Sequence, residues 1–174
     1  FIGTAALILL ASTSFLDEAA RYRSEFVGLL LLTTTALMLM AAASDLITLY
    51  IALEMSSLSI AFLSAWQKHD LRSTEAGLKY FLLSAMSSAI LLYGMAIIYG
   101  LTGQLQLNAI AQELTGRPSA ALFLGLTMLL AGFGFKVSAV PFQMWTPDVY
   151  EGAPTVVTAF LSVGPKAAGF SILI

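Results

Sequence analysis

Four ionisable residues lie inside long apolar runs of the sequence. They are Glu54 in LYIALEMSSLS, Lys79 in EAGLKYFLLS, Lys136 in GFGFKVSAVP and Lys166 in SVGPKAAGF. An ionised group near the centre of a bilayer costs about 2.5–3.5 kcal/mol, so four of them would cost roughly 10–14 kcal/mol. A penalty of that size indicates that these charges are paired, hydrated or able to lose their charge.

Burial also suits the four groups to proton exchange. Desolvation disfavours the charged form of a lysine, and a nearby carboxylate favours it. A lysine at position 136 would stay charged beside Glu54 and would release its proton more readily if the two groups separated. A site that can be switched in this way is what a proton relay needs. The pattern predicts such a relay, with Lys79 and Lys166 as its further sites.

Each of the four residues also has a structural interpretation. Glu54 and Lys136 could form an ion pair that only fixes two helices against each other. Lys79 follows Glu75 by four residues and could extend to the lipid headgroups. Lys166 could be a structural counter-charge. Counting from the expected helix ends places Glu54 and Lys136 at depths that differ by roughly 10 Å, at about 1.5 Å per residue, which leaves their pairing open.

Two prolines accompany two of the lysines. Pro141 has no N–H for the carbonyl of Val137, and Pro165 frees the carbonyl of Leu161 in the same way. Helices broken in mid-membrane beside charged groups are typical of the ion sites of transporters. Serine hydroxyls could bind water between the charged sites, or they could serve only the close packing of helices. These serines are Ser56, Ser57, Ser84, Ser87, Ser88 and Ser138.

The composition places these residues in a membrane. The chain of 174 residues is 59% hydrophobic and 10% charged, whereas a soluble domain carries about 25% charged residues. Lipid offers no partner to backbone groups, so helices are expected. We expect one all-α transmembrane domain of about six spans, cut at both ends from a longer protein, with the helix over 120–150 broken near Pro141. The expected spans are 1–16, 26–44, 46–66, 76–101, 120–145 and 153–174.

Several classes of site are excluded or unsupported. A net charge of −2 with eight Lys and Arg argues against a nucleic-acid partner. Zero cysteines exclude disulfides, thiolate zinc sites and cysteine-bound iron–sulfur clusters on this chain. His69 is a lone loop histidine that we expect to be solvated. No cofactor or metal site is predicted, and the expected surroundings are lipid, protons and internal water.

The connections between spans predict an orientation. The first and third connections hold Arg21, Arg23, Lys68 and Arg72, whereas the second and fourth hold Arg117 alone. Basic loops stay on the cytoplasmic side, which would place the later TPDVYEG loop there as well. The fourth connection, 102–119, fits either a short helix on the membrane surface or an ordered loop. The apolar residues of that helix would be Leu105, Leu107, Ile110, Ala111 and Leu114.

Three stretches resemble the antiporter-like membrane subunits of respiratory complex I. They are LYIALEMSSLS, GLKYF and KVSAVPFQMWTPDVYEGAPTVVTAFLSVGPKA. The third stretch is long and specific, with a lysine, a proline, W-x-P-D and G-A-P-T in the order of the family. Within the family the chain is most similar to the bacterial subunit N type, because Lys166 stands where the L and M types and the multisubunit antiporters carry histidine.

The resemblance implies a fold and a role. The family pairs a glutamate, here Glu54, with a lysine on a broken helix, here Lys136, and places further lysines where Lys79 and Lys166 stand. It implies that this chain holds most of the first of two inverted five-helix repeats. Its partners would be other membrane subunits, and NAD, flavin, iron–sulfur clusters and quinone would be bound elsewhere in the complex.

Three functions follow as candidates. The first is a proton-translocating subunit of a complex that oxidises NADH or a related donor and reduces quinone, with no redox centre on this chain. The second is a subunit of a multisubunit cation/proton antiporter. The third is a membrane scaffold that conducts no protons and uses its charges only to fix the helices. The first and second place this chain in a bacterial inner membrane.

Overall fold

The computed structural model describes residues 1–18, 22–116 and 118–173. These residues form a helical bundle, and the prediction of an all-α membrane fold is confirmed. In chain order the helices are α1 (Ile2–Ala11), α2 (Thr13–Glu18), α3 (Arg23–Ala42), α4 (Leu46–Ser64), α5 (Leu71–Thr102), α6 (Leu107–Leu114), α7 (Ala120–Val137), α8 (Trp145–Gly152) and α9 (Thr155–Leu173).

Five of the described helices are long and apolar enough to cross a membrane: α3, α4, α5, α7 and α9. The expected span over 1–16 is divided at Ser12 into α1, a shorter apolar helix, and α2. The helix expected over 76–101 begins five residues earlier, at Leu71, because Asp70 caps it by accepting a hydrogen bond from the Arg72 N–H. Of the two interpretations of the fourth connection, the structure has the helix, α6.

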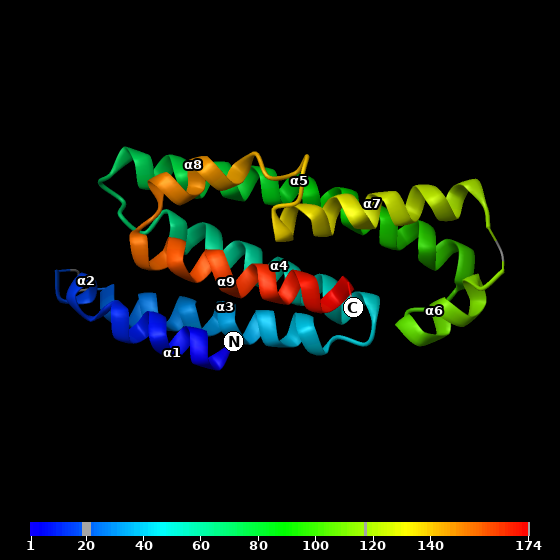
Figure 1. The fold of residues 1–174 in the computed structure, drawn as a ribbon, viewed down its shortest axis with the longest axis horizontal. Helices are drawn as coiled ribbons and strands as arrows, with labels where there is room; N and C mark the ends of the chain where they lie inside the picture. The colour runs from blue at the N-terminus through cyan, green and yellow to red at the C-terminus, as the bar shows by residue number, and fades with distance from the viewer. Residues whose placement is uncertain (19–21, 117, 174) are drawn as a thin grey trace.

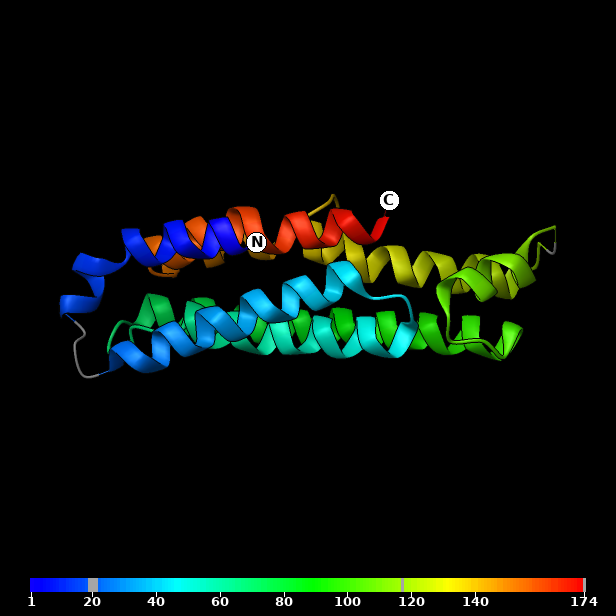
Figure 2. The same cartoon turned by 90° about the horizontal axis from the view of Figure 1, so that it is seen from below.

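The helices form two layers (Figures 1 and 2). One layer holds α3, α4 and the long α5, and the other holds α1, α9 and the two pieces α7 and α8. Both α7 and α8 lie along α5, with α7 against its C-terminal half and α8 against its N-terminal part (Figure 1). The prediction of one helix broken near Pro141 is confirmed, because α7 ends at Val137 and α8 begins at Trp145.

The two ends of the bundle differ in their connections. The turns α4–α5 and α8–α9 lie at one end, and the α3–α4 turn lies toward the other (Figure 1). There the residues that lead into α6 pair with the α3–α4 turn. The Leu46 N–H donates to the Leu105 carbonyl at 3.1 Å, and the Leu107 N–H donates to the Ser44 carbonyl at 3.0 Å. Arg21 and Arg117, which entered the count of basic residues, lie outside the described residues.

The α3–α4 turn is closed by an exposed carboxylate. Asp45 caps α4 by accepting a hydrogen bond from the Thr48 N–H at 2.9 Å. This bond to the backbone N–H of Thr48 holds the pKa of Asp45 below its ordinary value. The cap therefore keeps its full charge at neutral pH, at the helix N-terminus where a negative charge is favourable.

Helices α4 and α5 approach each other closely at Gly77. A Cβ atom at this position would lie 2.8 Å from the Ala61 carbonyl oxygen and would also overlap the Ala65 side chain. Both obstacles belong to the neighbouring helix and its end, so they cannot rotate away. The absence of a side chain at Gly77 sets the spacing between the helix that carries Glu54 and the helix that carries Lys79.

Gly77→Ala should therefore destabilise the protein, although alanine normally stabilises a helix interior by about 0.5–1 kcal/mol relative to glycine. Overpacking of this kind costs about 1–3 kcal/mol. The measurement is the temperature at which the full-length protein, tagged with a fluorescent reporter, is lost from its gel-filtration peak in detergent. Gly100→Ala is the matched control on the same helix, since nothing lies within 4 Å of its Cβ position. Equal midpoints for the two variants would contradict the close approach.

Candidate functional site

The break between α7 and α8 is built by local backbone geometry. Ser138 adopts a left-handed conformation with φ 59°, and its N–H donates to the Phe135 carbonyl at 3.2 Å. The Ala139 N–H donates to the Gly134 carbonyl at 2.8 Å, which closes the last turn. Pro141 follows through a cis peptide bond. Lys136 thus stands in the last turn of α7, where the helix dipole favours a positive charge.

The Lys136 ammonium is buried among neutral partners. The side chain is 3% exposed. Its Nζ donates to the Ser57 hydroxyl of α4 and, at 3.5 Å, to the Tyr80 hydroxyl of α5. It also lies 5.8 Å from the centroid of the Tyr80 ring. Among the described residues, no carboxylate oxygen lies within 4.0 Å of this ammonium. The three helices α4, α5 and α7 therefore meet at one cation held by hydroxyl groups.

Glu54 lies close to this site without forming an ion pair with it. It precedes Ser57 by three residues on α4, which corresponds to a rise of about 4.5 Å, so the depths of Glu54 and Lys136 differ less than sequence counting suggested. The carboxylate is half-buried, and its Oε1 has no hydrogen-bond partner. Its negative charge attracts the Lys136 ammonium. The structure brings Glu54 within electrostatic reach of the lysine and leaves a gap between them.

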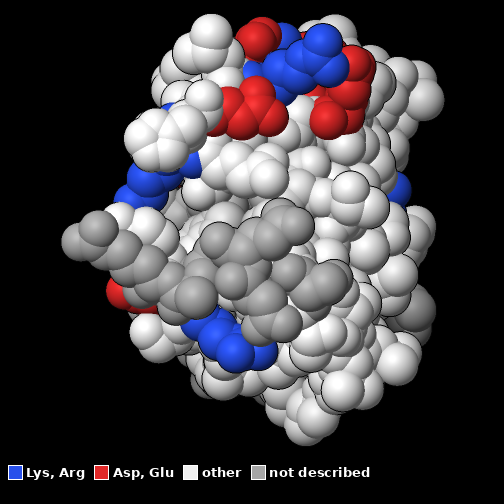
Figure 3. Space-filling model, turned by 90° about the vertical axis from the view of Figure 1, so that its left-hand side faces the viewer, with Lys and Arg blue, Asp and Glu red and all other residues white. Residues whose placement is uncertain are grey.

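Lys79 lies apart from this centre, in a cluster of charges. Its Nζ is 2.7 Å from Asp148 Oδ2 on α8 and 2.8 Å from Glu75 Oε1, one turn earlier on α5, and its side chain is 41% exposed. Arg72 and Glu151 line the same polar hollow. Figure 3 shows acidic and basic side chains gathered over this end of the bundle, where α5 begins and α8 lies. Lys79 thus joins α5 to α8 through carboxylates at the surface.

Lys166 faces an aromatic ring. Its Nζ lies 5.4 Å from the centroid of the Tyr150 ring on α8, within the range of a cation–π contact. The expected helix break at Pro165 is wrong: α9 runs from Thr155 to Leu173 with Pro165 inside it. A proline deprives a helix of one hydrogen bond, whereas the 138–144 segment combines a left-handed residue with a proline.

An aromatic cluster that sequence reasoning missed includes the two rings that face Lys136 and Lys166. Trp145 packs edge-on against Tyr80 at 5.0 Å and Tyr150 at 6.0 Å between ring centroids, and tilted against Phe135 at 5.3 Å. The Trp145 Nε1–H donates to the Phe135 carbonyl at 3.0 Å, which ties the start of α8 to the end of α7. In the sequence, Tyr80 stands next to Lys79 and Phe135 next to Lys136. These neighbouring aromatic residues were the signal that could have indicated the cluster.

The serines named in the sequence analysis divide between two roles, contact with the charged sites and packing of the helices. Ser57 contacts Lys136, whereas Ser56 and Ser84 donate to carbonyls of their own helices. Ser87 donates to the Gly132 carbonyl at 3.3 Å and so joins α5 to α7. The Ser138 hydroxyl is buried without a partner. The described contacts therefore give Ser57 a place at the lysine, and Ser56 and Ser84 a role in their own helices.

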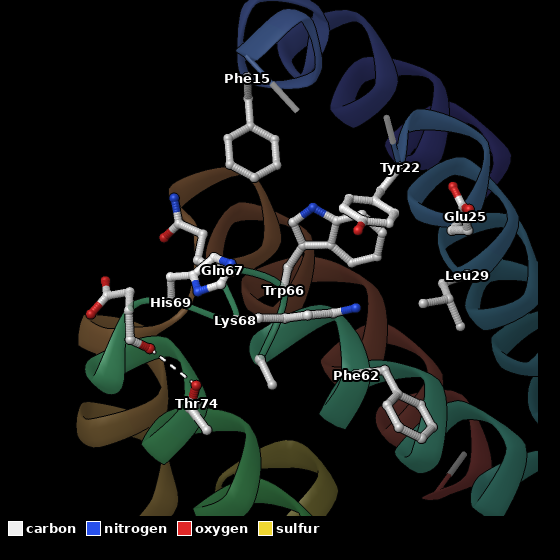
Figure 4. A pocket seen from close by; sticks show the side chains of 12 residues that line it. Phe15, Tyr22, Glu25, Leu29, Phe62, Trp66, Gln67, Lys68, His69 and Thr74 are labelled. Atoms are coloured by element: carbon white, nitrogen blue, oxygen red, sulfur yellow. Dashed lines mark hydrogen bonds between the residues drawn. The ribbon is translucent and has the colours of Figure 1, made fainter. Parts of the chain in front are cut away.

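Another hollow lies away from these lysines. A space of about 1110 Å³ opens at the charged end of the bundle, between the start of α3 and the α4–α5 connection. Figure 4 shows Phe15, Tyr22 and Trp66 around it, with the Lys68 ammonium 5.0 Å from the Tyr22 ring centroid. His69 is exposed here, as expected for a solvated loop residue. None of the four intramembrane ionisable residues lines this hollow, so it is separate from the lysine sites.

Ser57→Ala should cost more stability than Ser56→Ala. Both serines are buried on α4 and donate to the same Leu53 carbonyl at 2.7 Å, but Ser57 alone of the two contacts Lys136. Loss of a hydrogen-bond partner costs a buried polar group about 1–3 kcal/mol, and a charged group such as Lys136 more. The measurement is the thermal midpoint of the full-length protein in detergent. In a Lys136→Met background the two serine variants should become equal, and a difference that persists there would rule out the contact as its cause.

Known proteins resemble this chain in sequence and fold. The family described as NADH:quinone oxidoreductase/Mrp antiporter, TM, matches residues 43–174. The chain is 47% identical over 174 residues to NADH-quinone oxidoreductase subunit N of Desulfitobacterium hafniense, a match that covers 100% of this chain and 35% of that protein. The chain therefore spans about a third of the length of this relative.

Two solved assemblies contain a similar chain. In respiratory complex I from Thermus thermophilus with bound aureothin, a chain 41% identical superposes with a TM-score of 0.76 over 86% of this chain and 33% of that one. In the membrane-bound sulfane sulfur reductase, an archaeal respiratory membrane complex, a chain 27% identical superposes with a TM-score of 0.86. That match covers 99% of this chain and 36% of the other.

These matches confirm the resemblance inferred from the three sequence stretches, including its likeness to subunit N. The five candidate spans and the bacterial relatives identify a multi-pass protein of the bacterial inner membrane. The chain belongs to the family of transmembrane subunits shared by NADH:quinone oxidoreductases and Mrp antiporters.

Proposed function

We propose that this chain is part of a proton-translocating membrane subunit of an NADH:quinone oxidoreductase, or of a complex using a related donor. The observation that carries the proposal is the buried Lys136 ammonium at a helix break, held by neutral hydroxyls within electrostatic reach of Glu54. The chain moves protons and bears no redox centre. NAD, flavin, iron–sulfur clusters and quinone belong to other subunits, and the membrane subunits beside it are its partners.

The geometry supports a division of roles among the four residues. Lys136 is the central proton site, because a change in its surroundings alters which protonation state is favoured. Glu54 sets that balance by approaching or leaving the lysine. Lys166 passes protons onward to the half of the protein that lies outside this chain. Lys79 connects the central site to the charged end, where its ion pairs with Glu75 and Asp148 must open for it to take part.

The two alternatives differ in what supports them. A cation/proton antiporter subunit would use the same charges, but the relative and the solved structures matched here are named for respiratory complexes rather than for antiporters. A scaffold that conducts no protons would need the four charges only for packing. The buried lysine without a carboxylate partner does not favour that interpretation, because an unpaired buried charge is a poor structural device.

Lys136→Met and Glu54→Gln should each lower proton pumping by about tenfold or more, since one positioned acid–base group contributes about 10²–10⁴-fold to a proton transfer. The measurement is dye quenching by inverted membrane vesicles that contain the whole complex, normalised to the amount assembled. Lys68→Met is the matched control, because Lys68 is exposed in the α4–α5 connection. Normal pumping with normal assembly in both site variants would defeat the relay and leave the scaffold.

The orientation is proposed from the basic residues. Arg21, Arg23, Lys68 and Arg72 belong to connections that we place in the cytoplasm. A reporter that is active only after export should be inactive when fused at His69 and active when fused at Gln112, within α6. The result follows from retention of basic loops on the cytoplasmic side. An exported reporter at His69 would reverse the assignment.

A further inference from the structure

Lys136 and Lys166 each face a tyrosine, and both tyrosines pack against the same indole. Lys136 Nζ lies 3.5 Å from the Tyr80 hydroxyl. Lys166 Nζ lies 5.4 Å from the Tyr150 ring centroid. Trp145 packs edge-on against both rings, at 5.0 and 6.0 Å. Two phenols thus lie beside the two lysines and against one indole, and they have no part in the roles assigned above.

Tyr80 is placed to receive a proton from Lys136. The side chain is 1% exposed and accepts the long hydrogen bond from the ammonium. Its ring is fixed by Phe135 and Trp145, with centroids at 5.9 and 5.0 Å. A phenol can accept a hydrogen bond at its oxygen while donating its own proton elsewhere. With Lys136 on one side, the Tyr80 hydroxyl retains its own O–H for a second partner.

Tyr150 packs against the same indole as Tyr80. Its hydroxyl is buried and has no hydrogen-bond partner in the described structure. Its backbone carbonyl accepts a hydrogen bond from the Thr158 hydroxyl at 3.1 Å, which ties α8 to the helix that carries Lys166. An unpartnered hydroxyl therefore belongs to the residue whose ring faces Lys166.

Two further buried polar groups lie close to Tyr150 in the sequence. The side-chain oxygens of Gln143 and Thr146 are also buried without a hydrogen-bond partner. Gln143 belongs to the turn before α8, and Thr146 and Tyr150 are one turn apart on α8. Buried polar groups in proteins are generally hydrogen-bonded to protein or to water, and internal water uses such groups as its partners. The segment from the helix break to Tyr150 therefore offers internal water several buried polar partners.

We propose that the Tyr80 and Tyr150 hydroxyls carry the proton between Lys136 and Lys166, a step that deepens the relay under "Proposed function" and rests on it. The Lys136 ammonium gives a proton to the oxygen of Tyr80, which releases its own hydroxyl proton onward. Tyr150 repeats the exchange and passes a proton to the neutral Lys166 amine. Lys136 becomes neutral, Lys166 becomes an ammonium, and both phenols are neutral before and after.

Replacement of a phenol by phenylalanine separates this role from a structural one. Tyr150→Phe keeps the ring under Lys166 and the packing on Trp145, and it removes only the hydroxyl. We expect pumping by the intact complex in inverted vesicles to fall by about tenfold, in line with loss of one proton-transfer group, at unchanged assembly. The remaining pumping should slow further in D₂O, because proton transfer then limits the rate. Tyr93→Phe is the matched control, since Tyr93 is 60% exposed on α5.

Tyr80→Phe should give the same loss, and it decides the question if Tyr150→Phe fails to assemble. Lys136→Met, measured in parallel, keeps the two proposals apart. Pumping that is lost in Lys136→Met but equal to the control in both phenylalanine variants would overturn the tyrosine step and leave the relay intact. Normal pumping in Lys136→Met would overturn the relay itself.

Discussion

The structure depends on how one ammonium is held inside the membrane. Lys136 is almost fully buried, and its partners are two hydroxyls from two other helices. That arrangement requires α7 to stop one residue later, so that the chain can leave the helix and α9 can approach. A Cβ atom at Gly169 of α9 would lie 2.5 Å from Val137 Cγ1. The position of α9 beside the break therefore depends on the absence of a side chain there.

Neutral partners suit a site that must change its charge. A carboxylate in contact would hold the ammonium by several kcal/mol, even at the higher effective dielectric constants that describe real proteins. A hydrogen bond to a charged group contributes about 1.5–3 kcal/mol. The Lys136 ammonium is in contact with hydroxyls, and Glu54 lies one helical turn from Ser57. A movement of α4 or of the segment between α7 and α8 therefore changes the relative stability of the charged and neutral forms of Lys136 by an amount comparable to its hydrogen bonds. The gap between Glu54 and Lys136 is thus a property that the proposed relay uses.

The sequence predicted the features that have local causes. A lysine in an apolar run and a proline five residues later are both visible in one segment, so the broken helix was predictable. The partners of Lys136 depend on how three helices align, which residue counting from uncertain ends cannot supply. Pro165 was misjudged because a proline alone does not decide whether a helix ends. Tyr80 was missed because aromatic residues in apolar runs are usual in helix cores, and Tyr150 because TPDVYEG was expected to be a loop, whereas it belongs to α8.

The helix α5 connects the two charged regions without bringing them into contact. Lys79 and Tyr80 are neighbours in the chain, and successive side chains of a helix point about 100° apart. Lys79 consequently turns to the carboxylates of Glu75 and Asp148, whereas Tyr80 turns inward to Lys136. A rotation or shift of α5 would alter both sets of contacts together, because one helical turn carries them. The charged end of the bundle and its buried lysine are therefore joined by adjacent residues of α5, even though their charges remain separated.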